Sequence, residues 1–147
     1  MKLTSILKQI ESRPKAIILI GPPKSGKTRW LEEYQQKNKL SNYINLNIDA
    51  FNAPEERAVM LSSCLENKSN FIYEGVVLKE DRISKLIEKV KKNNYCVRLV
   101  YIKKNLTTLL ENNDDKNFDV KLKKLYKKSE DIYIKFKDKV DWVTEVK

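Results

Sequence analysis

The sequence predicts an α/β protein in which a parallel β-sheet is covered by helices on both faces. Short apolar segments of strand-like length alternate along the chain with longer segments of helical period, and the segment 16–20 is apolar throughout. Strands that are buried on both faces of a sheet have such continuous apolar runs. Strands that alternate with helices are typical of βαβ units, which place helices on both sides of a parallel sheet.

The individual elements follow from the spacing of apolar residues. A spacing of three to four predicts a helix, and a short run of branched or aromatic residues predicts a strand. Helices are expected at residues 3–11, 27–38, 53–67, 81–93, 106–111 and 119–136. Strands are expected at residues 16–20, 43–48, 71–73, 95–102 and 140–146, and a polar loop at 112–118.

Local chemistry supports several of these boundaries and faces. Pro14 ends the first helix, because proline cannot continue the hydrogen-bond pattern of a helix. Pro54 suits a first helical turn, and the carboxylates of Glu55 and Glu56 are favourable there. The inward face of the helix at 81–93 is expected to hold Ile83, Leu86, Ile87 and Val90. One face of the helix at 27–38 is expected to hold Trp30, Leu31 and Tyr34.

Length and composition bound the class of protein. A chain of 147 residues with 41% hydrophobic residues predicts one domain, 1–147, with one core. No apolar run approaches the roughly 20 residues of a membrane span, and no leader pattern is visible, so a cytoplasmic protein is expected. Cys64 and Cys96 are then expected to be reduced thiols. The chain has no histidine, which excludes Ser-His-Asp and Cys-His catalysis and most zinc sites.

The chain is strongly basic, with a net charge of +10. Residues 1–74 hold 11 basic and 8 acidic residues, against 19 and 12 in residues 75–147, so the second half carries most of the excess. A basic surface favours polyanions such as nucleic acid or nucleotides. Solvated helices in a lysine-rich coding background are the other interpretation. Both interpretations, polyanion binding and a solvated helix face, apply to five lysines of the helix at 119–136, namely Lys121, Lys123, Lys124, Lys127 and Lys128.

The sharpest motif is GPPKSGKT, at residues 21–28, which matches G-x-x-x-x-G-K-[ST]. Its glycines allow the backbone to curl so that amide groups and the following helix N-terminus face a chain of phosphates. Lys27 can reach the outer phosphates, and Thr28 can offer its hydroxyl to Mg²⁺. The motif follows a predicted strand and opens a predicted helix. ATP and Mg²⁺ are therefore the expected cofactors, bound by Gly21, Pro22, Pro23, Lys24, Ser25, Gly26, Lys27 and Thr28.

Two acidic residues lie where strands are expected to end, the edge at which ligands bind in open α/β sheets. Asp49 follows the second strand, where it could accept a proton from an attacking hydroxyl or help to hold Mg²⁺. A cap for the segment before Pro54 is the alternative. Glu74 ends the third strand just before Gly75, and it could order a magnesium-bound water or bind substrate hydroxyls. A solvent-facing carboxylate is the alternative there.

Phosphoryl transfer also requires cations around the moving group. Many small kinases supply them from an arginine-rich lid between the fourth strand and the last helix, here residues 111–118, which contain no arginine. Lys116 is the candidate within the lid, and Arg29, just after the loop, is another. Arg57, on the next helix, is a third candidate, and it is expected to bind the substrate. Arg98 alternates along a strand and is expected to be structural.

Over about residues 15–136 the chain resembles the P-loop kinases grouped around the phage polynucleotide kinases and the zeta toxins. Asp49-Ala50-Phe51 is similar to the Asp-x-Phe pattern of the zeta toxins, in which the Asp is the base. The polynucleotide kinases have a second acid at the position of Ala50, and that acid is their base. The resemblance therefore implies that Asp49 takes this role here.

Two further segments carry the resemblance. Tyr73-Glu74-Gly75 is similar to the Ile-Glu-Gly segment of the zeta toxins, whose Glu touches the substrate. Residues 112–116 align with the polynucleotide kinase lid pattern Arg-Asn-x-x-Arg, with Asn112 and Lys116 in place of its arginines.

The resemblance implies a three-layer P-loop NTPase fold with a five-stranded parallel sheet in the order 2-3-1-4-5. It also implies ATP-dependent phosphorylation of a hydroxyl. The acceptor is expected to be a nucleic acid or a nucleotide. A small metabolite such as a nucleoside or sugar nucleotide is the alternative, and a non-catalytic nucleotide-binding module is a third possibility. No motif selects ATP over GTP or indicates an oligomeric state.

Overall fold

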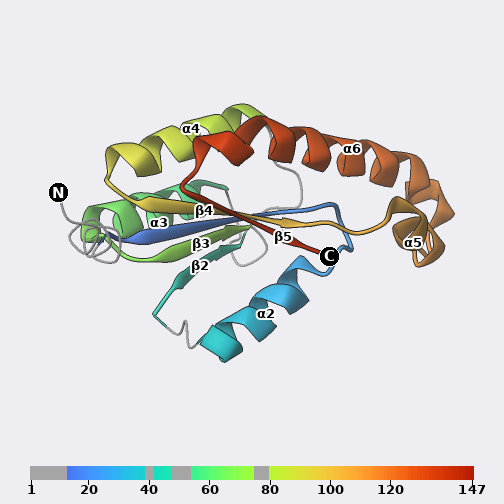
Figure 1. Ribbon diagram of the computed structural model, residues 1–147, viewed down its shortest axis with the longest axis horizontal. Coiled ribbons are helices and arrows are strands. Elements are labelled where there is room, and N and C mark those ends of the chain that lie inside the picture. The colour runs from blue at the N-terminus through green and yellow to red at the C-terminus, as the bar shows by residue number, and fades with distance from the viewer. Residues whose placement is uncertain (1–12, 39–41, 48–53, 75–79) are drawn as a thin grey trace.

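The computed structural model describes residues 13–38, 42–47, 54–74 and 80–147. Five strands form one sheet in the order β2-β3-β1-β4-β5, and every neighbouring pair is parallel (Figure 1). Both the sheet and its strand order agree with the expectation. The strands are β1 Lys15–Ile20, β2 Ile44–Asn47, β3 Phe71–Glu74, β4 Cys96–Ile102 and β5 Trp142–Val146.

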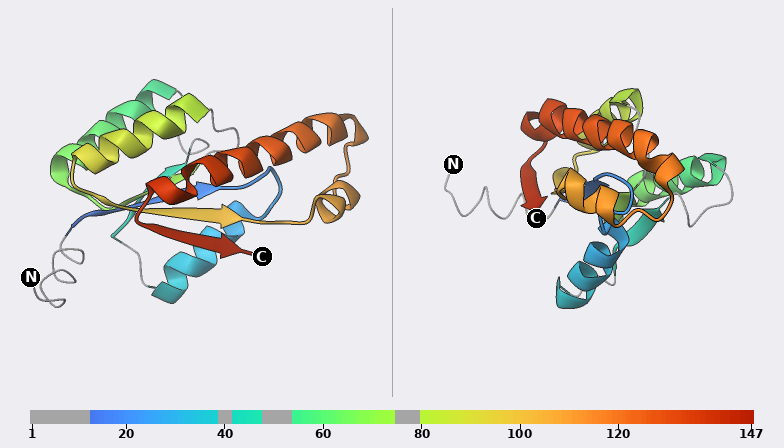
Figure 2. Two further views of the ribbon diagram at one scale, coloured as in Figure 1. Left: turned by 45° about the horizontal axis from the view of Figure 1, so that its top comes forward. Right: turned by 90° about the vertical axis from the view of Figure 1, so that its right-hand side faces the viewer.

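Helices cover both faces of this sheet. In Figure 1, α3, α4 and α6 lie over one face and α2 lies under the other, which gives three layers. Figure 2 shows that α5 lies beyond the carboxyl end of β4, away from the layers themselves. The helices are α2 Lys27–Asn38, α3 Pro54–Asn67, α4 Glu80–Lys92, α5 Leu106–Glu111 and α6 Asp119–Phe136.

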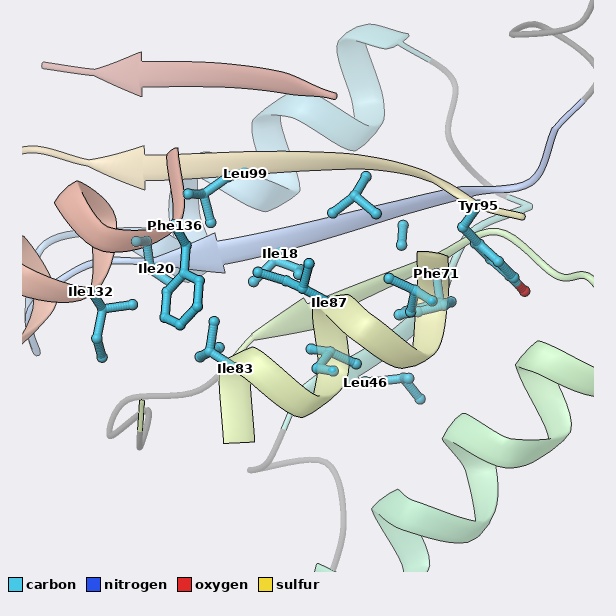
Figure 3. Packing of buried hydrophobic residues seen from close by; sticks show 14 of the residues in the cluster. Ile18, Ile20, Leu46, Phe71, Ile83, Ile87, Tyr95, Leu99, Ile132 and Phe136 are labelled. Carbon is cyan, nitrogen blue, oxygen red and sulfur yellow. The ribbon is translucent and has the colours of Figure 1, made fainter. Parts of the chain in front are cut away.

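Side chains alternate between the two faces along the central strand. Ile18 and Ile20 pack into the larger core cluster, and Ile17 and Leu19 pack into the smaller cluster on the opposite face. Figure 3 shows the larger cluster between the sheet and its covering helices. This pattern explains the continuous apolar sequence of β1, since both of its faces are buried. The predicted inward residues of α4 are all buried, namely Ile83, Leu86, Ile87 and Val90.

The smaller cluster confirms the face predicted for α2. Leu31 is buried in it, and Trp30 and Tyr34 pack against it. Arg98 is structural, as expected, because its guanidinium donates to Thr144 Oγ1 and to the Tyr34 hydroxyl.

The cysteines also agree with expectation. Cys64 and Cys96 are both buried free thiols, and burial raises the pKa of Cys64. Among the helices of the described ranges, none is long and apolar enough to cross a membrane.

Some boundaries differ from the expected ones. The third strand continues to Glu74, so that residue belongs to the sheet. The segment at 112–118 is not a plain loop, because Lys116–Phe118 forms a 3₁₀ turn. The Asp115 carboxylate caps this turn by accepting from the Asn117 amide at 3.0 Å. The helix expected at 3–11 lies outside the described residues.

Candidate phosphate-binding site

The loop 21–26 leaves the carboxyl end of β1 and leads into α2, and the geometry favours glycine at both of its ends. A Cβ on Gly21 would lie 3.0 Å from Ser25 Oγ and 3.2 Å from the Ile102 carbonyl oxygen, which is tighter than ordinary van der Waals contact. Gly26 has a φ of +90°, which a residue with a side chain rarely adopts. Its carbonyl then accepts from the Trp30 amide at 2.9 Å, as in the first turn of a helix. The loop therefore curls into the N-terminus of α2, as the motif predicts.

The loop itself contains a buried hydroxyl. Ser25 is 2% exposed, and among the described residues its Oγ has no hydrogen-bond partner. A buried hydroxyl without a partner is unfavourable, so such groups in native proteins point to an absent ligand or water. Phosphate oxygens would accept a hydrogen bond from it. The loop therefore fits the phosphate chain of a nucleotide.

The motif lysine is buried in the same loop. Lys27 is 6% exposed, and its ammonium donates to the carbonyl oxygens of Gly21 and Pro22, each at 2.9 Å. Burial lowers its pKa to about 8, while the nearby Glu74 carboxylate acts in the opposite direction. A desolvated ammonium whose hydrogen-bond acceptors are neutral carbonyls favours an incoming anion.

The structure brings two predicted residues from distant parts of the chain together. Thr28 Oγ1 donates to Glu74 Oε1 at 3.2 Å, and Glu74 is only 4% exposed. A hydroxyl beside a carboxylate is a suitable pair of oxygen ligands for Mg²⁺. Asp49, the other predicted metal ligand and the predicted base, lies outside the described residues. Within the described ranges, three or more acidic or cysteine side chains do not gather into a metal site.

Arg57 also lies beside Glu74. Its guanidinium stacks 3.7 Å above the centre of the Tyr73 ring, and its Nη2 donates to the Glu74 backbone carbonyl. The side chain is 7% exposed. The end of β3 therefore holds a buried cation and a buried carboxylate next to each other, and both residues are substrate-binding candidates.

The two other predicted catalytic cations have different contacts. Arg29 is exposed and pairs with Glu33 along α2 at 3.3 Å. Lys116 is exposed, and its ammonium donates at 2.9 Å to the Leu110 carbonyl near the end of α5. These contacts do not include the loop or Glu74, so catalytic roles for Arg29 and Lys116 remain predictions.

A contact that the sequence did not reveal joins the loop to the lid. Lys24 Nζ donates to Asn113 Oδ1 at 2.6 Å, across 89 positions of the chain. Asn113 is only 1% exposed. In the sequence it is one of two adjacent asparagines in a polar stretch, and nothing in that stretch marks it as buried.

Comparison with known proteins supports the fold. No family model matches the chain, and no curated protein matches it. A structure from the PezAT chromosomal toxin–antitoxin system of Streptococcus pneumoniae has a TM-score of 0.53 and 21% identity, over 74% of this chain. This chain spans only 59% of that one.

Two other solved structures align over more of their length. The structure of APE1195 has a TM-score of 0.51 and 18% identity, over 90% of this chain and 85% of its own. A gluconokinase from Sinorhizobium meliloti 1021 has a TM-score of 0.51 and 17% identity, over 90% of this chain and 83% of its own. With the strand order 2-3-1-4-5, helices on both faces and the loop after the first strand, these likenesses show that the chain has the P-loop NTPase fold.

Proposed function

We propose that the protein is an ATP-dependent kinase that transfers the γ-phosphoryl group to a hydroxyl. One observation carries this proposal. At the carboxyl end of β1 and β3, the loop and the start of α2 bring together buried Lys27, the Thr28–Glu74 pair and the hydroxyl of Ser25, which has no hydrogen-bond partner among the described residues. Buried polar groups such as Ser25, Lys27 and Glu74 are unfavourable for folding alone, and they cluster at sites where a ligand completes them.

Each group has a task in the proposed reaction. The loop amides and Lys27 hold the phosphates and stabilise the charge that develops on them. Thr28 and Glu74, with Asp49, would hold Mg²⁺, which neutralises phosphate charge when it is bound. The acceptor oxygen forms a bond to the γ-phosphorus as the bond to the departing ADP oxygen breaks. Asp49 is proposed to take the hydroxyl proton, and Arg57 is proposed to help orient the acceptor.

The net charge of the chain supports a nucleic acid or a nucleotide as acceptor. A groove of about 460 Å³ runs along α6 and is lined by Lys123, Lys124, Lys127 and Lys128. Glu80 and Asp131 line it too, and Lys127 pairs with Asp131 at 3.1 Å, so its charge is mixed. If these lysines bind DNA phosphates, the logarithm of the DNA-binding constant should fall linearly with the logarithm of the salt concentration, with a slope of about −0.9 per phosphate contact. A flat response would exclude this role for the groove.

The arrangement at the end of β3 favours a second acceptor class. Arg57 and Glu74 are buried together there, which suits a small polyhydroxylated molecule better than an extended strand of nucleic acid. A gluconokinase among the similar structures agrees with a small-metabolite acceptor. The resemblance of Tyr73-Glu74-Gly75 to the zeta toxins leads to the same class.

Labelled ATP tests the proposal and separates the acceptors. The protein is incubated with Mg²⁺, γ-labelled ATP and a mixture of DNA, RNA and small hydroxylated molecules, beside the Lys27→Ala variant. Label on the polymers supports the nucleic-acid acceptor, and label on a small molecule supports the alternative. Mg·ATP binding without transfer to any acceptor would leave a non-catalytic nucleotide-binding module.

Asp49→Asn tests the proposed base. This variant should bind Mg·ATP nearly as well as the wild type and should transfer no phosphate, because an amide cannot accept the hydroxyl proton. Loss of Mg·ATP binding would instead identify Asp49 as a ligand of the metal.

A further inference from the structure

Lys24 occupies an unfavourable backbone position in the phosphate-binding loop. Its φ is +63°, in the left-handed region that disfavours residues with a side chain. The motif leaves this position open to any residue, and glycine would fit its backbone best. A left-handed backbone does not by itself mark a functional residue, since Lys68 has a φ of +56°, so the contacts of the Lys24 side chain decide its role.

The side chain of Lys24 reaches the lid. Its ammonium lies 2.6 Å from Asn113 Oδ1 and 5.7 Å from the centre of the Phe118 ring. Both partners belong to residues 111–118, the segment from which many small kinases present arginines. The lid is therefore tied to the phosphate-binding loop by a lysine of the loop.

The orientation of the Asn113 amide is fixed by its other contacts. Asn113 Nδ2 donates to Asp119 Oδ1 at 2.7 Å and to the Asp115 carbonyl at 2.6 Å. Only the NH₂ group can face two acceptors, so the amide oxygen must face Lys24. The Asn113 side chain is only 1% exposed, and this network holds its amide oxygen, the acceptor for Lys24, in one place.

The other candidate cations near the lid have different contacts. The Lys116 ammonium donates a hydrogen bond to the Leu110 carbonyl, and Arg29 forms a salt bridge with Glu33. Residues 111–118 contain no arginine. The ammonium of Lys121, on α6, also lies near the lid, 5.9 Å from the centre of the Phe118 ring. Among these cations, Lys24 is the one that belongs to the phosphate-binding loop and contacts the lid.

We propose that Lys24 is the phosphate-binding cation that replaces the missing lid arginines, and that Asn113 is the positioning residue that holds its ammonium between loop and lid. The inference rests on the proposed kinase function. It adds a second cation to Lys27 and explains how a lid without arginine can serve phosphoryl transfer.

Lys24→Met tests the cation, with Lys68→Met as a matched control. Lys68 is also exposed, has a φ of +56°, and donates its ammonium to a backbone carbonyl, that of Asn93. It lies at the opposite end of the sheet from the loop, just before the start of β3. Lys24→Met should lower kcat by about 10- to 100-fold, the range for one charge-assisted contact. It should weaken Mg·ATP binding by about fivefold or more. Lys68→Met should change neither.

Two further variants separate this role from a merely structural one. Lys24→Gly fits the left-handed backbone, so it should unfold no earlier than the wild type and still lose as much kcat as Lys24→Met. Asn113→Ala should lower kcat about tenfold in the wild type but by less than about twofold in the Lys24→Met background, because the ammonium it positions is then absent. Equal losses in both backgrounds would overturn the role of Asn113.

Failure of the inference and failure of the kinase function give different results. If the wild type transfers phosphate and Lys24→Met and Lys24→Gly match it in kcat and in Mg·ATP affinity, the inference is overturned. If the wild type transfers no phosphate, the kinase function fails, and affinity for Mg·ATP and for inorganic tripolyphosphate decides the inference. Weaker binding by Lys24→Met and not by Lys68→Met then supports it, and equal binding overturns it.

Discussion

The two ends of the sheet differ. At the end where the strands begin, called here the amino edge, polar groups hydrogen-bond to one another. At the end where the strands finish, called here the carboxyl edge, buried polar groups lie around the phosphate-binding loop. The Tyr95 hydroxyl lies 2.9 Å from the Cys64 carbonyl oxygen and 2.8 Å from that of Ser69. Asp141 Oδ2 accepts from the Val97 amide at 2.8 Å. The donors in these contacts are the Tyr95 hydroxyl and the Val97 amide, both neutral, and none of the contacts needs a ligand.

The carboxyl edge differs mainly in the number of buried polar and charged side chains. Six buried polar or charged side chains are found in the described part of the chain, and five of them lie at this edge. Desolvated charges contribute little or nothing to stability, so the three charged members of this set favour the proposed binding role of this edge. The five are Ser25, Lys27, Arg57, Glu74 and Asn113.

The largest effect on stability is expected at the amino edge. Tyr95 is 1% exposed and its ring packs at 5.5 Å from that of Phe71. Tyr95→Ala should lower the free energy of unfolding by about 3–5 kcal/mol, because it leaves a cavity. Urea unfolding measures this loss, with Tyr95→Phe as the control that removes only the hydroxyl. The folded fraction should still bind Mg·ATP with wild-type affinity, and a weakened site would contradict the separation of the two edges.

The opposite pattern is expected for the buried lysine at the carboxyl edge. Lys27→Ala should lose about 2–4 kcal/mol of transition-state stabilisation, the usual value for one well-placed donor. Its free energy of unfolding should not fall, since a desolvated ammonium is removed. Steady-state kinetics and urea unfolding on the same preparation provide the two measurements. Retained kcat/KM would refute the assignment of the site.

The two edges also differ in how far sequence alone predicts them. Strand-like apolar runs and the G-x-x-x-x-G-K-[ST] spacing are local signals, and they located the strands and the loop. The strand order came from resemblance, and the structure agrees with it. The face of α4 could be predicted because helical periodicity reports burial directly.

Contacts between distant residues were beyond the reach of sequence patterns. Thr28 and Glu74 meet because β1 and β3 pair in a register that sets Leu19 opposite Glu74, and no motif encodes that register. Asn113 is buried only because Lys24 and Asp119 approach it from two other segments. Each of these polar contacts lies at the carboxyl edge, where tertiary structure overrides local pattern.

A smaller effect should follow from the protonation of Lys27. The pKa of Lys27 is about 8 in the folded protein, against an ordinary value of 10.5. Between these two pH values the unfolded chain therefore binds more protons than the folded protein, and the contribution of Lys27 to the free energy of unfolding rises with pH. Between pH 7.5 and 9.5 the wild type should gain about 1–2 kcal/mol in free energy of unfolding relative to Lys27→Met. Parallel pH profiles for the two proteins would contradict a desolvated lysine.

The smallest effect compares the two lysines that have left-handed backbone conformations. Lys68 directly follows α3, where the Ser69 amide donates to the Cys64 carbonyl in the pattern of a helix C-terminus that favours glycine. Lys68→Gly should therefore raise the free energy of unfolding by about 0.5–1 kcal/mol, because glycine removes the strain but also loses more chain entropy on folding. Thermal unfolding measures the gain, and kcat and Mg·ATP affinity should not change. Lys24→Gly should move stability in the same direction and yet lose kcat, because only at the carboxyl edge does a ligand depend on the ammonium. If the two variants behaved alike in both measurements, the left-handed lysine of the loop would be an accident of sequence, as the one at the amino edge is.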